Sequence, residues 1–186
     1  TCLVTFVSDT PDFVFSNNIV RNKRNRGVLV QVPNAVIENN AFMYVGHGSL
    51  QIASAMDKFN EATLAQGTTV KNNKFIGNCY TKPGPLYGDI SVFAIASNGS
   101  VAPKGTMHDM LIENNFISRN GNAAVSFRGV GSSTVKDNLF NETSYTQPSG
   151  DAMNTIFQLT NCTDVTIQGN YSNYTLGNGL SGLTFE

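Results

Sequence analysis

The sequence predicts an all-β solenoid of about six to seven coils, because one short motif recurs along most of the chain. The motif is clearest at residues 36–42, which read Val-Ile-Glu-Asn-Asn-Ala-Phe. When the copies are aligned on the second Asn, the steps between them are 22, 33, 42, 23 and 32 residues. These steps fit one coil of about 22 residues, lengthened by insertions in some copies. The aligned residues are Asn18, Asn40, Asn73, Asn115, Asn138 and Asn170.

Two apolar positions accompany each aligned asparagine. Side chains along a strand point alternately to its two faces, so positions that stay apolar are expected to face the core. The first position lies three residues before the asparagine and holds Phe15, Ile37, Val70, Ile112, Val135 and Ile167. The second lies two residues after it and holds Val20, Phe42, Phe75, Ile117, Phe140 and Ser172. We therefore expect a strand on each side of the asparagine, each with one inward stack.

The position directly after the first stack is expected to face solvent, and it alternates in charge. Parallel strands lie about 4.8 Å apart, so each Glu should contact a Lys of the coil above or below. The asparagine column itself suits a tight bend, because Asn tolerates a left-handed backbone and its amide can pair with the next amide, giving an asparagine ladder. The charged column reads Ser16, Glu38, Lys71, Glu113, Lys136 and Gln168.

A further strand is expected about ten residues after the asparagine. It begins near Val28 and Leu50 in two short coils and is delayed to Ile90 in a longer one. The insertions then form long loops, which on a rigid scaffold are usually functional or disordered. A helical spacing of apolar residues within 55–65 predicts a short helix outside the coils. The predicted loops are residues 53–67, 77–88, 98–108 and 142–151.

Length and composition favour a single domain over residues 1–186. The net charge is −1, and charged residues make up 13% of the chain, below the roughly 25% of ordinary soluble domains. We therefore expect no nucleic-acid and no membrane partner, and no run of about 18 apolar residues is present. Cys2, Cys79 and Cys162 lack the spacing of metal ligands, so neither a metal nor another cofactor is predicted.

The order of four segments resembles that of a known family. The segments are RNRGVLVQVPNAVIENNAF at 24–42, GSLQIAS at 48–54, FNEA at 59–62 and TTVKNNKFIGNC at 68–79. Residues 13–172 resemble the right-handed parallel β-helix proteins of the pectate-lyase-like superfamily. The four segments are most similar to the β-helical α-1,3-galactosidases of glycoside hydrolase family 110. The resemblance implies a right-handed parallel β-helix and the hydrolysis of terminal α-galactose with inversion.

The same resemblance places Glu61 at the loop glutamate of the family. The nearby family aspartate matches Ala55, and a later glutamate matches Ile95, so two acidic positions of the family are absent from this chain. Inverting hydrolysis requires two carboxyl groups about 6.5–9.5 Å apart. We therefore predict that Glu61 is one catalytic acid and that Asp57 or Asp89 supplies the second carboxylate.

Aromatic and basic side chains in or near the loops are predicted to bind the substrate. Aromatic rings are common in the walls of small-molecule sites, where they can stack on sugar faces. The cations of residues 21–26 could neutralise uronate carboxylates, or they could form an ordinary solvated turn. The two histidines lie far apart in the sequence with no nucleophile motif nearby, which argues against a catalytic triad. The predicted binding residues are Tyr44, Phe59, Tyr80, Tyr87 and Arg26.

Three functions are compatible with these observations. The first is a carbohydrate-active β-helix protein, most simply a glycoside hydrolase acting on terminal α-galactosides or related glycans. The second is a non-catalytic structural, adhesive or carbohydrate-binding module, and the third is a polysaccharide lyase that uses the basic run. Each implies a glycan or polysaccharide partner and a secreted or extracellular protein. Because solenoids need caps, we expect either a fragment of a longer β-helix or ends covered by other chains.

Overall fold

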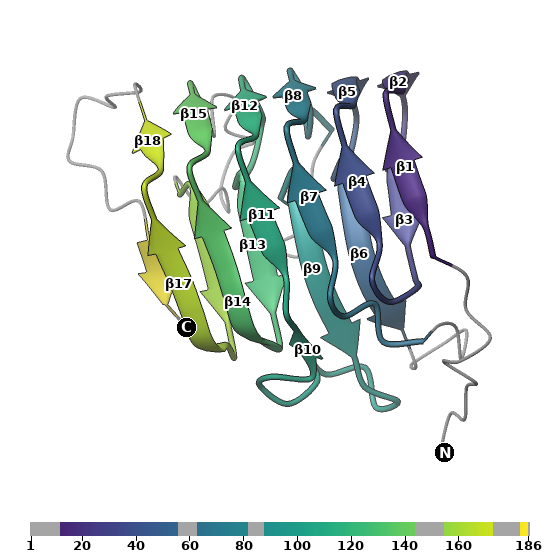
Figure 1. Ribbon diagram of the computed structural model, residues 1–186, viewed down its shortest axis with the longest axis vertical. Helices are drawn as coiled ribbons and strands as arrows, with labels where there is room; N and C mark the ends of the chain where they lie inside the picture. The colour runs from purple at the N-terminus through teal and green to yellow at the C-terminus, as the bar shows by residue number, and fades with distance from the viewer. Residues whose placement is uncertain (1–11, 56–62, 82–87, 144–154, 173–182, 186) are drawn as a thin grey trace.

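The computed structural model describes residues 12–55, 63–81, 88–143, 155–172 and 183–185, and these residues form parallel β-sheets and no helix. Figure 1 shows the strands of successive coils stacked in chain order. This confirms the predicted all-β fold and is consistent with a solenoid, because successive coils contribute strands in order to each of three parallel sheets. The helix predicted within 55–65 falls mainly outside the described residues. In the part of the chain that is described, no helix is long and apolar enough to cross a membrane.

Sheet A precedes the asparagine turn in every coil. Its main strands pair in parallel, and the two-residue strand β10 pairs with the beginning of β14. The strands are β1 (Val14–Ser16), β4 (Val36–Glu38), β7 (Thr69–Lys71), β10 (Met107–His108), β11 (Leu111–Glu113), β14 (Val130–Lys136) and β17 (Thr163–Gln168).

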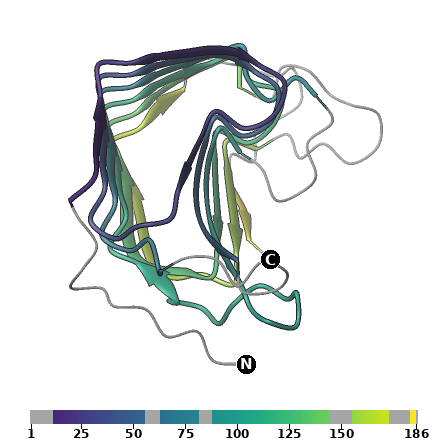
Figure 2. The ribbon, with the colours of Figure 1, turned by 90° about the vertical axis from the view of Figure 1, so that its right-hand side faces the viewer.

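Sheet B follows the asparagine turn, and sheet C follows the next turn. Seen from one end in Figure 2, the three sheets surround the core of the solenoid. Sheet B consists of β2 (Ile19–Lys23), β5 (Ala41–Val45), β8 (Lys74–Ile76), β12 (Phe116–Ser118), β15 (Leu139–Asn141) and β18 (Tyr171–Ser172). Sheet C consists of β3 (Val28–Val30), β6 (Leu50–Ala55), β9 (Ile90–Ile95), β13 (Val125–Arg128), β16 (Phe157–Thr160) and β19 (Leu183–Phe185).

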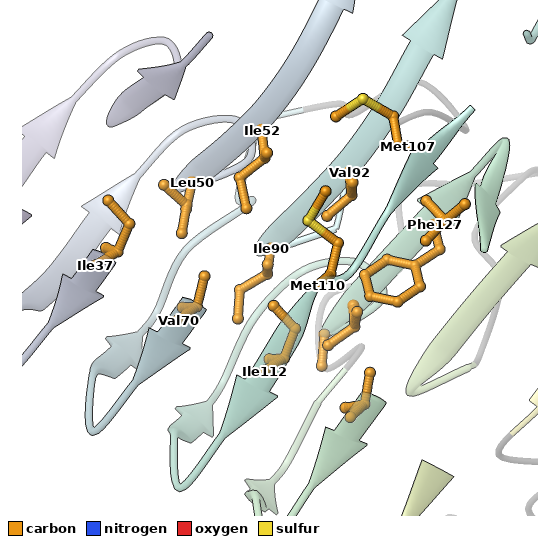
Figure 3. Packing of buried hydrophobic residues seen from close by; sticks show 14 of the residues in the cluster. Ile37, Leu50, Ile52, Val70, Ile90, Val92, Met107, Met110, Ile112 and Phe127 are labelled. Atoms are coloured by element: carbon orange, nitrogen blue, oxygen red, sulfur yellow. The ribbon is translucent and has the colours of Figure 1, made fainter. Parts of the chain in front are cut away.

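The inward stack of sheet A lies where the sequence predicts it. Ile37 pairs with Val70, Val70 with Ile112, and Ile112 with Val135, and all four side chains are fully buried. Figure 3 shows Ile37, Val70 and Ile112 on successive strands, all packed toward the same core. Burying such side chains is the main source of stability for the solenoid.

The inward stack of sheet B contains aromatic rings at successive levels. The rings of Phe42 and Phe75 lie parallel, with an interplanar angle of 4° and 4.9 Å between their centroids. Both side chains are fully buried. An aromatic pair of this kind adds about 0.5–1.5 kcal/mol beyond its buried area. The stack thus contributes to coil register as well as to burial.

The asparagine turns are held by side-chain amides that connect one coil to the next. Nδ2 of Asn40 donates to Oδ1 of Asn73 at 3.0 Å, and Nδ2 of Asn73 donates to Oδ1 of Asn115 at 3.0 Å. The backbone N–H groups of Asn40 and Asn73 donate to the same oxygens. Buried amides paired in this way satisfy polar groups that would otherwise destabilise the turn.

The left-handed backbone conformation falls one residue earlier than we expected. The residue directly before each aligned asparagine has a positive φ, and five of these six residues are Asn or Asp, which tolerate this conformation. The aligned asparagine itself is left free to donate toward the neighbouring coils. The residues with positive φ are Asn17, Asn39, Asn72, Asn114, Asp137 and Gly169.

The predicted charge pairing is confirmed in sheet A. Nζ of Lys71 lies 3.2 Å from Oε2 of Glu38, and Nζ of Lys136 lies 3.0 Å from Oε2 of Glu113. All four side chains are partly exposed. Pairs of this kind contribute at most about 1 kcal/mol, so they refine the register that the buried stacks set.

Candidate functional site

The turn between sheets B and C gathers the polar side chains that best form a binding site. Two coils stack closely there, because the Gly46 N–H donates to the Lys23 carbonyl at 2.8 Å and the His47 N–H donates to the Asn25 carbonyl at 3.5 Å. His47 is thereby placed directly beside the residues that follow β2. Residues separated by 22 positions in the sequence thus share one surface.

Gly46 allows this close approach because it has no side chain. A Cβ atom at Gly46 would lie 2.1 Å from the Arg24 carbonyl oxygen and 3.1 Å from Cγ2 of Thr81. The first distance is shorter than any real contact, so another residue would push the coils apart. Thr81 closes the turn from the next coil, where its N–H and its Oγ1 donate to the Gly46 carbonyl at 3.0 and 2.7 Å.

A hollow of about 330 Å³ opens at this turn and is lined, among the described residues, by Arg24, Asn25 and His47. Its volume lies at the lower end of the range of about 300–1,000 Å³ that is common for small-molecule sites. A guanidinium, an amide and an imidazole all offer N–H donors to a ligand. The hollow can therefore bind a group that is rich in hydrogen-bond acceptors.

Two exposed tyrosines predicted to bind substrate lie on the coils next to the hollow. Tyr80 is 52% exposed, and its hydroxyl donates to the Lys23 carbonyl at 3.3 Å, directly beside Arg24. Tyr44 is 57% exposed, has a φ of 54°, and lies over Gly77. A left-handed conformation at a bulky residue costs roughly 1–2 kcal/mol, and strain of this kind is concentrated at functional sites.

Arg26, which we also predicted to bind substrate, points from the same turn onto the outer face of sheet C. Its Nη1 donates to Oε1 of Gln51 at 3.1 Å. Gln51 begins an outward row of polar side chains that continues through Ser91, Ser126 and Gln158. All four are buried, so sheet C is covered on both faces, whereas sheets A and B have exposed outer residues.

Asp89 lies in the interior of the protein and not at the surface. It is fully buried, and Oγ of Ser49 donates to its Oδ1. Burial raises the pKa of Asp89 from its ordinary 3.8 to about 7, and hydrogen bonds from Ser49 and Asn78 lower it in part. Asp89 therefore lines no cleft among the described residues. Asp89 instead stabilises the turn, because it accepts a hydrogen bond from Ser49, which lies two residues after His47.

Cys79 belongs to the same buried turn. Its Sγ donates to the His47 carbonyl at 3.5 Å. Burial raises the pKa of the Cys79 thiol, and the nearby charge of Asp89 raises it further. A buried thiol that stays protonated is chemically inert, so Cys79 has a structural role.

The other predicted residues, Asp57, Phe59, Glu61 and Tyr87, lie outside the described residues. Within the described ranges, the carboxylates of Glu38, Glu113 and Glu142 each pair with a Lys or Arg, and none lines the hollow. No group of three His, Cys, Asp or Glu side chains in these ranges could hold a metal ion.

Sequence reasoning missed Asn25 and His47 as neighbours. The signal was available, because each lies seven residues after an aligned asparagine, Asn18 or Asn40. Equal offsets from a repeated position predict stacking in a solenoid with parallel coils. As a triad candidate, His47 is judged only by nearby nucleophile motifs, which give no register through this turn.

Comparison with known proteins finds no matching family model. The chain is 31% identical to α-1,3-galactosidase B of Parabacteroides distasonis over 70 aligned residues, which make up 37% of this chain. It is 28% identical to α-1,3-galactosidase A of Peterkaempfera griseoplana over 130 aligned residues, which make up 69% of this chain. It is 29% identical to α-1,3-galactosidase B of Akkermansia muciniphila over 106 aligned residues, which make up 56% of this chain.

These matches concern a short part of each relative. The aligned segments make up 11%, 17% and 13% of the lengths of the three proteins. The chain is thus similar, at 28–31% identity, to one segment of proteins named α-1,3-galactosidase.

Proposed function

We propose that this chain is part of a carbohydrate-active β-helix protein, a glycoside hydrolase that acts on terminal α-galactosides or related glycans. The observation that carries the proposal is its similarity to several proteins named α-1,3-galactosidase. The stack of parallel sheets and the exposed Tyr80, which reaches the Lys23 carbonyl beside Arg24, support it. We include in the proposal the right-handed coil sense, the secreted or extracellular location and the single domain that the sequence predicts.

In this proposal the turn between sheets B and C binds the sugar. Tyr80 and Tyr44 offer aromatic faces, and Arg24, Asn25 and His47 offer N–H donors to hydroxyl oxygens. A bound sugar ring would thus contact both an apolar face and several donors, which is the usual composition of a small-molecule site.

The chemical step is assigned to Glu61 as general acid, with Asp57 as the second carboxylate. Inversion requires one carboxyl group to protonate the leaving oxygen and a second to activate water on the opposite face of the sugar. Asp89 is the weaker candidate for the second role, because its side chain is buried beside Ser49.

The test is the hydrolysis of an aryl α-galactoside by the purified protein. Glu61→Gln should lower the rate at least about 100-fold, which is the smaller contribution expected of one general acid or base. Glu113→Gln is the matched control, because this Glu is paired with Lys136 on sheet A. Full activity of Glu61→Gln would refute the assignment. New ultraviolet absorbance on uronate polymers would instead identify a lyase, which forms a double bond.

A non-catalytic carbohydrate-binding module is the second candidate. The observation that favours it is that no described carboxylate lines the hollow. In this case the protein should bind galactose-containing glycans on an array while leaving every aryl glycoside intact. Replacing Tyr80 by Ala should then weaken this binding.

A further inference from the structure

We propose that the hollow lined by Arg24, Asn25 and His47 is a subsite for an anionic substituent, a carboxylate or a sulfate, carried by a sugar. This inference rests on the proposed function in one respect, namely that the ligand is a glycan. It goes beyond that function because it assigns an acidic class of glycan to a defined group of residues.

Charge is the first argument. Arg21, Lys23, Arg24 and Arg26 are all exposed, at the end of β2 and in the turn that follows it. The ion pairs found in the described part of the chain join Lys71 to Glu38, His108 to Asp109, Arg119 to Glu142 and Lys136 to Glu113. The cations of residues 21–26 take part in none of them. Among the described residues, this run thus carries positive charge that no carboxylate pairs, on a protein whose net charge is −1.

Geometry is the second argument, because Arg24 alone among these cations lines the hollow. A guanidinium presents a planar fork of N–H donors that matches a carboxylate or a sulfate in two parallel hydrogen bonds. Asn25 and His47, from two neighbouring coils, line the same hollow. Polar side chains from two coils thus line one small volume, which suits an anion with several oxygens.

The rigidity of the backbone is the third argument. The contact of Gly46 with the Arg24 carbonyl and the hydrogen bonds from Thr81 to Gly46 fix the turn before any ligand arrives. A site that is already ordered loses less conformational entropy on binding. This favours specific recognition of the anion over a loose attraction to a charged surface.

The neighbouring aromatic ring indicates that the anion belongs to a sugar. Tyr80 reaches from its own coil to the Lys23 carbonyl, one residue before Arg24, and half of its surface is exposed. An acidic sugar can place its ring on Tyr80 and its charged group on Arg24. A free inorganic anion would use only the second contact.

The experiment compares three oligosaccharides of equal length by titration calorimetry: one with galacturonate, one with sulfated galactose and one with uncharged galactose. The wild-type protein should bind at least one acidic oligosaccharide about tenfold or more tightly than the uncharged one, as expected for a charge-assisted hydrogen bond. This preference should weaken as salt is added. The relative affinities for the two acidic ligands then distinguish carboxylate from sulfate.

Arg24→Gln should remove this preference, so that the acidic oligosaccharides bind no more tightly than the uncharged one. Arg21→Gln is the matched control, since it removes the same charge from the same exposed run without touching the hollow. Arg24→Lys tests the fork, because it keeps the charge and should restore only part of the preference.

Equal binding of charged and uncharged oligosaccharides by the wild-type protein would overturn the proposal. An equal loss of preference in Arg21→Gln would also overturn it, because a diffuse charge effect would then suffice. Turnover of the aryl α-galactoside is measured in parallel. Turnover without acid preference refutes only the anionic subsite, whereas acid preference without turnover refutes only the hydrolase.

Discussion

Replacing Asp89 by Asn should stabilise the protein at neutral and alkaline pH. Asp89 is fully buried, and burial raises its pKa from 3.8 to about 7. The unfolded chain therefore loses this proton near pH 4, whereas the folded protein keeps it until about pH 7. The contribution of Asp89 to stability is thus highest below pH 4, falls between pH 4 and 7, and stays low above pH 7. An Asn cannot ionise, and its Oδ1 can still accept the hydrogen bond from Ser49.

The magnitude follows from the size of the shift. A change of about 3 pH units, at about 1.4 kcal/mol per unit, gives about 4 kcal/mol between the two ends of this range. The difference in unfolding free energy between Asp89→Asn and the wild type should therefore grow with pH up to this value. Taking the difference removes the contributions of the other carboxyl groups, which are common to both proteins.

The assay is urea denaturation of both proteins at a series of pH values from 4 to 8, analysed by linear extrapolation. The expected result is near-equal stability at pH 4 and a variant that is clearly more stable at pH 8. A free-energy difference that stays constant across the series would refute the reasoning. Asp89 would then have the same pKa in the folded and the unfolded protein.

Three further predictions concern the stacking of the coils. Gly46→Ala should destabilise the protein by about 1–3 kcal/mol and weaken ligand binding, because the new Cβ would overlap the Arg24 carbonyl. Urea denaturation measures the first effect and calorimetry the second. A variant with normal stability and binding would show that the close contact is unimportant. Ile112→Ala should cost about 2–5 kcal/mol by opening a cavity in a fully buried stack, and a loss below 1 kcal/mol in urea would contradict the assigned packing. Glu113→Gln should cost at most about 1 kcal/mol, since the pair with Lys136 is partly exposed, and a large drop in melting temperature would mean that this pair does more than refine the register.

The coil stack could be predicted from the sequence because its determinants recur at constant spacing. Ile37, Val70 and Ile112 all lie three residues before an aligned asparagine, so one alignment places the whole stack. The position of the left-handed residue could not be chosen in the same way. Both residues of each Asn-Asn pair, such as Asn39 and Asn40, tolerate that conformation, and only the buried amide hydrogen bonds distinguish them.

The candidate site was only partly predictable, because it depends on turns and insertions. The sequence identifies Tyr80 and Arg26 as a loop aromatic ring and a cation, and the structure shows that they are exposed or partly exposed. Recognising His47 as part of the site requires the alignment of the coils to be extended beyond the strands into the turn. Asp89 directly precedes β9, just as Ser49 directly precedes β6. This equivalence predicts that the two side chains meet in the interior, whereas the role of second carboxylate that we predicted for Asp89 requires a position in a cleft. The insertion that contains Glu61 follows no period, so the repeat gives no register for it.

The most direct test of the proposed function is the configuration of the sugar that the protein releases. Proton nuclear magnetic resonance can follow an aryl α-galactoside during the first turnovers, before the free sugar equilibrates. A glycoside hydrolase that inverts, as the sequence resemblance implies, releases β-galactose first. Appearance of β-galactose in the wild type and its absence in Glu61→Gln is the predicted result. First appearance of α-galactose, or no release by the wild type at all, would contradict the account.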